Sequence, residues 1–246
     1  MSDIKKNTVA VILAGGTGKR MGSDVPKQYI RVCGKPLLYY TIKAFEDSFV
    51  EKIVLVCKEG DEEYCRKQIV EEYDFSKVSV ITTGGRERYH SVLNGLRACK
   101  GLFEEAIPDS PRIVFIQDGA RPFTDEEIIG RCYEDAVRYG SGVAAVKSKD
   151  TVKIADADGF VVSTPSRDFV YMMQTPQTFM FDDIYEAYEK LAESEKDADG
   201  CATVSVTDDA SVMECFGGKR VKLSEGSYRN IKITTPEDLI FVKDYF

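Results

Sequence analysis

Short apolar runs along the chain alternate with segments in which apolar residues recur at helical spacing. The runs have strand length and many β-branched residues, and they are Thr8–Leu13, Lys52–Cys57, Val78–Thr82, Arg112–Ile116 and Gly142–Val146. Continuous apolar runs of this kind are typical of strands that are buried on both faces. Helical spacing lies between them, at residues 36–45, 61–73, 88–99 and 125–139. These strand–helix–strand units predict a Rossmann-like α/β fold, with a mostly parallel sheet and helices on both faces.

The pattern changes after residue 146. Residues 150–163 alternate between apolar and polar and contain Asp158-Gly159, a dipeptide typical of a β-hairpin. Two short strands are barely stable alone in water, so we expect a protruding arm that packs against another element, such as a second subunit. The chain then returns to helical spacing at 182–193, at 207–215 and in a last helix whose predicted N-cap is Thr235. We interpret residues 1–246 as one domain that carries the arm.

Composition and charge exclude several classes of protein. The chain has 246 residues, 43% of them hydrophobic, and its formal net charge of -8 argues against a nucleic-acid or membrane-surface binder, which needs a basic field. No apolar run approaches the roughly 20 residues that span a bilayer. The 7 cysteines form no C-x-x-C pair, which favours reduced thiols in a cytoplasmic protein over a zinc ribbon or a disulfide framework. His90 is the single histidine, so a histidine-rich metal site is excluded.

A glycine-rich loop follows the first predicted strand, at the edge where open α/β sheets bind their ligands. It reads AGGTGKRMG over residues 14–22. It lacks the lysine of a P-loop, and it departs from a G-x-G-x-x-G dinucleotide loop because three residues separate its last two glycines. Lys19, Arg20 and Lys27 add cations to the backbone amides, which suits a nucleoside triphosphate. The competing interpretation is a glycine turn with solvated charges, and the buried strand and the number of cations favour the triphosphate site.

This loop belongs to a set of motifs that resembles a known family. LAGGTGKRMG and PKQY are followed, in one order along nearly the whole chain, by GGRERYHSV, QDGARPF, DTVK, TPSR, QTPQTF, TDDAS and NIKITTPEDL. The set is similar to that of the sugar-phosphate nucleotidyltransferases and, more narrowly, of the 2-C-methyl-D-erythritol 4-phosphate cytidylyltransferase family. The ribitol-5-phosphate cytidylyltransferases are near relatives. AGG resembles these relatives, whereas DTVK and TDDAS resemble the methylerythritol family, which we favour.

The resemblance implies a GT-A-like nucleotidyltransferase fold and a Mg²⁺-dependent reaction in which CTP and a polyol phosphate give a CDP-polyol and pyrophosphate. The favoured acceptor is 2-C-methyl-D-erythritol 4-phosphate, an intermediate of non-mevalonate isoprenoid biosynthesis, and the alternative is ribitol 5-phosphate. The acceptor phosphate is largely ionised near pH 7, because its second pKa is about 6, so the enzyme needs no nucleophilic side chain. Its work would be alignment and charge neutralisation. The resemblance also implies a homodimer that forms through the 150–163 arm.

The resemblance assigns site residues by position. The catalytic residues would be Arg20, Lys27 and Lys232. The nucleotide would contact Ala14, Gly15, Gly16, Gly18, Gly84, Gly85, Arg88, Ser91, Asp118, Gly119 and Arg121. The acceptor would contact Thr151, Arg167, Thr175 and Lys232, with Arg167 acting across the dimer interface. Asp118 would hold Mg²⁺ together with phosphate oxygens.

Two other interpretations remain for these residues. Without the resemblance, the glycines are ordinary turn residues, Asp118 ends a strand, and Lys232 and Arg167 are surface charges. A catalytically silent nucleotide-binding regulator on the same scaffold is an interpretation of a different class. The retained cations and Asp118 argue against it.

Overall fold

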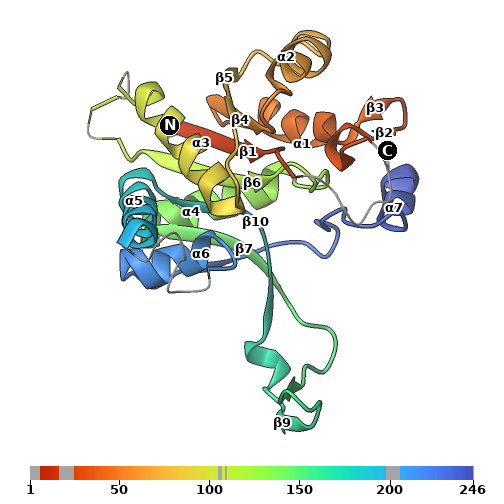
Figure 1. The fold of residues 1–246 in the computed structure, drawn as a ribbon, viewed down its shortest axis with the longest axis vertical. Helices are drawn as coiled ribbons and strands as arrows, with labels where there is room; N and C mark the ends of the chain where they lie inside the picture. Colours follow the sequence, from red (N-terminus) through yellow and green to blue (C-terminus); the bar gives the residue numbers. More distant parts are fainter. Residues whose placement is uncertain (1–5, 17–24, 105–106, 109, 198–205, 246) are drawn as a thin grey trace.

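A 7-stranded sheet forms the centre of the computed structural model (Figure 1), and its strand order is β11-β7-β10-β6-β1-β4-β5. The structure describes residues 6–16, 25–104, 107–108, 110–197 and 206–245. The strands of the sheet are β1 (Thr8–Leu13), β4 (Lys52–Cys57), β5 (Val78–Thr83), β6 (Ile113–Asp118), β7 (Ser141–Lys147), β10 (Tyr171–Met180) and β11 (Leu223–Glu225). β10 runs antiparallel to its neighbours β6 and β7, and the other pairings in this sheet are parallel. The predicted mostly parallel sheet is confirmed.

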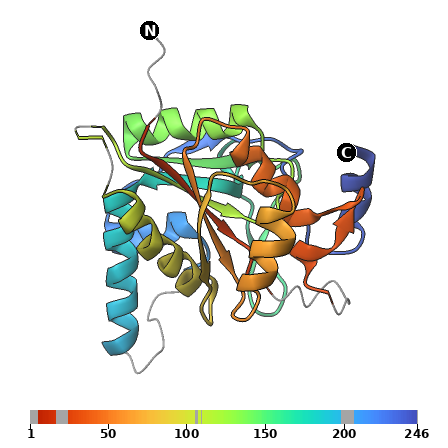
Figure 2. The same ribbon diagram turned by 90° about the horizontal axis from the view of Figure 1, so that it is seen from above.

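Alternation along β1 sends its side chains to both faces of the sheet. Val9 and Val11 belong to one buried cluster with residues of α3 (Arg88–Leu102), α5 (Phe181–Asp197) and α6 (Asp209–Val212). Ala10 and Ile12 belong to another cluster with residues of α1 (Leu37–Glu46) and α4 (Glu126–Tyr139). Each of these four side chains is at most 2% exposed, and burying a valine or isoleucine fully contributes about 1.5–3 kcal/mol relative to exposure. Helices therefore cover both faces of the sheet, as predicted (Figure 2).

The helices begin and end close to the predicted positions. They are α1 (Leu37–Glu46), α2 (Glu62–Cys65), α3 (Arg88–Leu102), α4 (Glu126–Tyr139), α5 (Phe181–Asp197), α6 (Asp209–Val212) and α7 (Asp238–Tyr245). π-helical turns extend α2 and α6, over Arg66–Glu71 and Met213–Gly217. Within the described ranges, no helix is long and apolar enough to cross a membrane.

An arm leaves the body of the molecule between β7 and β10 (Figure 1). It carries the antiparallel strands β8 (Ile154–Ala155) and β9 (Val161–Ser163) and a 3₁₀ turn over Arg167–Phe169. The connection between β8 and β9 places Gly159 at a φ of 85°, where a larger side chain would be strained. Every residue of β8 and β9 is exposed, so the arm has no core of its own.

Several elements differ from the sequence expectations, and the edge strand β11 has no predicted counterpart. β10 lies inside the sheet but has no predicted counterpart, because its QTPQTF segment mixes polar residues and a proline and so lacks an apolar run. The predicted N-cap at Thr235 is wrong, since α7 begins at Asp238. The backbone N–H of Thr235 donates to the Asp238 carboxylate at 2.9 Å, so this aspartate holds the turn that precedes the helix.

Candidate active site

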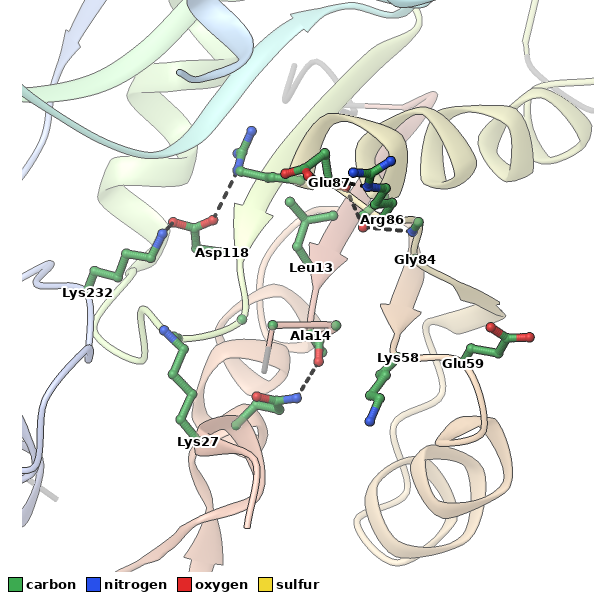
Figure 3. Close-up of a pocket in the computed structure, with 18 residues that line it drawn as sticks. Leu13, Ala14, Lys27, Lys58, Glu59, Gly84, Arg86, Glu87, Asp118 and Lys232 are labelled. Atoms are coloured by element: carbon green, nitrogen blue, oxygen red, sulfur yellow. Dashed lines mark hydrogen bonds and ion pairs between the residues drawn. The ribbon is translucent and has the colours of Figure 1, made fainter. Parts of the chain in front are cut away.

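The carboxyl ends of β1, β4, β5 and β6 open on a cleft of about 740 Å³ (Figure 3). Ligands of open α/β sheets bind at this edge, because loops from neighbouring parallel strands converge there. Most of the predicted nucleotide and catalytic residues line this cleft, namely Ala14, Gly15, Gly16, Lys27, Gly84, Gly85, Arg88, Ser91, Asp118, Gly119 and Lys232.

Other predicted residues lie elsewhere. Arg121 and Thr175 are packed behind Asp118 rather than in the lining of the cleft. Thr151 and Arg167 are exposed on the arm, where Arg167 Nη1 donates to the carbonyl of Lys149 at 3.2 Å. One chain therefore does not bring the arm residues to the cleft. The predicted Gly18 and Arg20 lie outside the described residues.

Asp118 is the acidic centre of a group of cations. Its Oδ2 lies 2.8 Å from Lys232 Nζ and 3.7 Å from Arg121 Nε, and its Oδ1 lies 3.7 Å from Arg88 Nε (Figure 3). Burial alone would raise the pKa of the Asp118 carboxyl, but the charges of the surrounding cations hold this pKa well below its usual range. The carboxylate is therefore ionised near neutral pH.

Arg121 and Thr175 fix Asp118 from behind. Arg121 donates through Nη1 to the carbonyl of Asn230 at 2.7 Å and through Nη2 to the carbonyl of Met173 at 3.3 Å. The Thr175 hydroxyl accepts the backbone N–H of Asp118 at 3.1 Å, and Thr175 is 3% exposed. Burial lowers the pKa of Arg121, and Asp118 opposes this shift. Both residues are thus placed to hold Asp118 in position.

Lys27 and Lys232 converge on one side of the cleft (Figure 3). Lys27 begins a short 3₁₀ turn, and its Nζ donates to the carbonyl of Ile233, the residue after Lys232, at 3.1 Å. Gln28 in the same turn donates through Nε2 to the carbonyl of Ala14 at 2.6 Å. Residues far apart in sequence are therefore joined into one cationic wall next to the glycine-rich loop.

Bare backbone forms part of the floor. A Cβ on Gly119 would lie 2.7 Å from the carbonyl oxygen of Leu13, which accepts the Gly119 N–H at 2.9 Å. A Cβ on Gly84 would lie 2.7 Å from the Ser91 hydroxyl. At Gly119 the Leu13 carbonyl leaves no room for a side chain, and a residue larger than glycine at position 84 would have to displace the Ser91 side chain.

His90 caps the helix at the edge of the cleft. The backbone N–H of Glu87 donates to His90 Nδ1 at 3.2 Å, and His90 Nε2 lies 3.0 Å from Glu195 Oε2. An acceptor at Nδ1 assigns the ring proton to Nε2, which then donates to Glu195. The sequence interpretation gave His90 no catalytic role, and this capping contact explains its place at the start of α3.

Sequence reasoning assigned no role to several residues around the cleft, including Gln28, Arg86 and Glu87, which line it. Lys58 and Glu59 also line it, directly after β4. Their position after the KIVLVC strand is a signal that would have identified them, because all parallel strands of this sheet end at the same edge. Asp209 lies behind the cleft and pairs with Arg88. TDDAS contains it, but nothing in the sequence indicates a partner 121 residues away.

The donor set fits Mg²⁺ only if the nucleotide supplies further ligands. Within the described ranges, no group of three or more His, Cys, Asp or Glu residues could hold a metal. Mg²⁺ commonly takes one or two carboxylates, substrate phosphates and waters. Asp118 lines the cleft, and its Oδ1 lies 3.7 Å from Arg88 Nε, beyond hydrogen-bond distance, so its carboxylate could contribute one ligand to such a shared ion.

A glycine-bordered cleft with converging cations, at the carboxyl edge of a mostly parallel sheet, suits the phosphates of a nucleotide, and comparison with known proteins places the chain among the α/β nucleotidyltransferases. The family model described as IspD, 2-C-methyl-D-erythritol 4-phosphate cytidylyltransferase, matches residues 8–246. The chain belongs to this family.

Individual relatives agree with this assignment. A 2-C-methyl-D-erythritol 4-phosphate cytidylyltransferase of Clostridium kluyveri is 44% identical over 98% of this chain and 97% of its own length. One of Lachnospira eligens is 45% identical over 95% of this chain and 98% of its own. The solved 4-diphosphocytidyl-2C-methyl-D-erythritol synthase of Anaerococcus prevotii aligns with a TM-score of 0.78 and 36% identity, covering 98% of this chain and 96% of that one.

Proposed function

We propose that this protein transfers the cytidylyl group of CTP to 2-C-methyl-D-erythritol 4-phosphate and releases pyrophosphate. An oxygen of the acceptor phosphate attacks the α-phosphorus of CTP, and the bond from that phosphorus to the bridging oxygen of the β-phosphate breaks. The leaving group is pyrophosphate. The acceptor oxygen is already anionic near pH 7, because the second pKa of a phosphate monoester is about 6. The reaction therefore needs cations and alignment rather than a nucleophilic side chain.

The convergence of Lys27 and Lys232 on the cleft is the observation that carries this proposal. Their amines are placed to neutralise the triphosphate and the charge that develops around the α-phosphorus as pyrophosphate departs. Gly15 and Gly16 follow Ala14 on the adjacent loop and offer peptide groups to the phosphates, and Gly84 and Ser91 border the region proposed for the cytosine and ribose. Arg20, predicted to be catalytic by the resemblance, stays a prediction.

Asp118 is the residue proposed to hold Mg²⁺. The phosphate oxygens of CTP, rather than further protein side chains, would supply other ligands of the ion. The bound ion would supply positive charge at the triphosphate. Lys232 shares the Asp118 carboxylate at 2.8 Å, so the amine and the proposed metal position lie beside the same phosphates. Arg121 and Thr175 would keep the carboxylate aimed at the cleft.

We propose that a second copy of the chain supplies the rest of the acceptor site. Thr151 and Arg167 are exposed on the arm, and the arm also exposes Phe160, Val162 and Phe169 by 73%, 67% and 85%. Apolar side chains exposed to this degree on a hairpin without a core favour a homodimer formed through the arm. Arg167 of one subunit would then bind the acceptor phosphate beside the cleft of the other.

The proposed setting is the cytoplasm, within non-mevalonate isoprenoid biosynthesis. The cysteines of the described ranges are free thiols, as the prediction of a reducing compartment expects. Full-length relatives of this family carry the name of the methylerythritol enzyme.

Pyrophosphate release from CTP tests the proposal. Wild-type protein with Mg²⁺ is assayed with 2-C-methyl-D-erythritol 4-phosphate, with ribitol 5-phosphate and without acceptor. We expect release with the first acceptor and, at equal concentration, at least a hundredfold lower kcat/KM with the second. Preference for ribitol 5-phosphate would reassign the acceptor. CTP binding without release in any reaction would instead indicate a silent nucleotide-binding regulator.

A further inference from the structure

Asp209 lies behind the cleft and holds the side chain of Arg88. Its two carboxylate oxygens accept hydrogen bonds from Arg88 Nη1 and Nη2 at 2.8 and 2.7 Å. The hydroxyl of Tyr188 donates a third hydrogen bond to Asp209, at 2.5 Å. Asp209 is 0% exposed and Tyr188 is 1% exposed. A carboxylate this deeply buried requires charged or hydrogen-bonded partners, and here the main partner is a residue that lines the cleft.

Arg88 lies near the carboxylates of Asp209 and Asp118 and forms hydrogen bonds with that of Asp209. Both of its Nη groups bond to Asp209, whereas its Nε lies 3.7 Å from Asp118 Oδ1, beyond hydrogen-bond distance. Burial alone would lower the pKa of Arg88, but the charge and hydrogen bonds of Asp209 raise it above its ordinary value. The bidentate pair therefore fixes the plane of the guanidinium, with its Nε edge toward the cleft.

The position of Asp209 is itself fixed by the sheet. Asp208 caps α6 by accepting the backbone N–H of Ser211 at 2.9 Å. Gln177 on β10 donates through Nε2 to Asp208 at 3.0 Å and accepts the backbone N–H of Ala210 at 2.8 Å. These bonds hold the residues on both sides of Asp209, so its carboxylate is a rigid anchor for Arg88.

We propose that Asp209 is a positioning residue, which holds the Arg88 guanidinium at the wall of the cleft for contact with the nucleotide and keeps it from a hydrogen bond with Asp118, to which its Nε lies at 3.7 Å. This inference rests on the proposed function and adds a residue that acts through Arg88. If the Asp209 charge is removed, Asp118 is the remaining carboxylate beside the guanidinium, and Arg88 turns toward it. The nucleotide then loses a prepared contact, and Asp118 gains a competing partner.

Steady-state kinetics with a double-mutant cycle test the inference. Asp209→Asn keeps the size of the side chain, and Arg88→Met removes the cation without leaving a charged side chain at that position. We expect Asp209→Asn to raise the KM for CTP at least tenfold while kcat changes by less than about threefold, since loss of binding common to ground and transition states appears in KM. The double variant should have a KM within about twofold of Arg88→Met, because Asp209 acts through Arg88.

Glu189→Gln is the matched control. Glu189 on α5 accepts two hydrogen bonds from Arg97 on α3, at 3.0 and 2.8 Å. This is a second bidentate pair that involves an arginine of α3, and neither of its residues lines the cleft. We expect the KM of this variant for CTP to equal that of the wild type. Multiplied effects of Asp209→Asn and Arg88→Met in the double variant would show that Asp209 is only a structural residue and would overturn the inference.

A ligand-free measurement separates this inference from the proposed function. NMR of arginine side chains reports the rate of rotation about the Nε–Cζ bond of Arg88. We expect slow rotation in the wild type and in Glu189→Gln, and rotation at least tenfold faster in Asp209→Asn. Unchanged rotation overturns the inference whatever the kinetics. Wild-type protein that releases no pyrophosphate refutes the proposed function instead, and the rotation rates still decide whether Asp209 holds Arg88.

Discussion

The cleft and the arm differ in how their polar and apolar side chains are supported. In the cleft, Asp118 is held by Lys232, Arg121 and Thr175, and Arg88 is held by Asp209. On the arm, every residue of β8 and β9 is exposed. The cleft is therefore assembled by one chain, whereas the exposed arm is the surface that we propose a partner completes.

This difference separates two kinds of change. A substitution in the cleft removes one charge from a network that the rest of the fold supports, so its effect falls on binding or turnover. A substitution on the arm changes a surface that the single chain does not use for its own core. Its effect is therefore expected on association and on acceptor binding by the proposed partner site.

The largest expected effect is that of Lys27→Ala on turnover. The amine is proposed to neutralise the triphosphate at the reacting centre, and loss of one preorganised donor of this kind costs about 10²–10³ in kcat. Pyrophosphate release under saturating CTP measures it. Lys219→Ala is the control, because Lys219 forms an exposed ion pair with Asp183 at 2.6 Å. Near-normal turnover of Lys27→Ala would refute the assigned role.

Arg167→Ala should affect acceptor use rather than CTP use. Loss of a charged contact to the acceptor phosphate is expected to reduce kcat/KM for that substrate by about 10–100-fold, the equivalent of about 1.5–3 kcal/mol. The KM for CTP should stay within about twofold of its wild-type value. Lys153→Ala, on the same arm, is the control, since its Nζ donates only to Thr164 within the arm at 2.8 Å. An unchanged kcat/KM for the acceptor contradicts the proposal.

Phe160→Ser and Phe169→Ser should weaken association of the chain. Each replaces a phenylalanine that is 73% or 85% exposed in the single chain, so folding of that chain loses little. If a partner buries them, each costs about 1.5–3 kcal/mol of association, or roughly 10–100-fold in the dimer dissociation constant. Light scattering coupled to size-exclusion chromatography measures the mass. A monomeric wild type would rule out the homodimer.

The smallest expected effect is that of pH. Asp118 has a lowered pKa in the folded protein, so its contribution to stability is complete above its unfolded pKa of about 3.9 and is lost only as pH falls through the lower folded value. It does not titrate near neutrality. The acid limb of kcat/KM should instead follow the acceptor phosphate, with about a twofold loss between pH 7 and pH 6. A flat profile down to pH 5 would contradict nucleophilic attack by the dianion.

Much of the sheet could be predicted because its strands are marked by local apolar runs. β1 and β4 begin and end where the runs Thr8–Leu13 and Lys52–Cys57 do. β10 was not predicted because its sequence contains no continuous apolar run, although it pairs with both β6 and β7. A strand of mixed polarity is recognisable only once its neighbours are in place, since tertiary context outweighs local propensity.

Part of the site could be predicted because its residues follow strands, and the rest could not because it depends on side-chain packing. Gly84 and Asp118 follow predicted strands, and the sheet edge gathers such ends regardless of their distance in sequence. The resemblance then brought in Lys232, which local pattern alone left as a surface lysine. Asp209 and the buried place of Thr175 depend on side-chain packing, and no local pattern reports which buried carboxylate meets which arginine.

Subunit complementation tests most directly whether one chain holds the cleft while the arm serves its partner. Lys27→Ala and Arg167→Ala chains are purified separately, mixed in equal amounts, dissociated and allowed to reassociate together, and then assayed for pyrophosphate release at subsaturating acceptor. Random pairing places an intact cleft beside an intact arm in about a quarter of all sites, so about a quarter of wild-type activity should return. Activity no greater than the mean of the two separate variants would contradict an arm that acts across the interface.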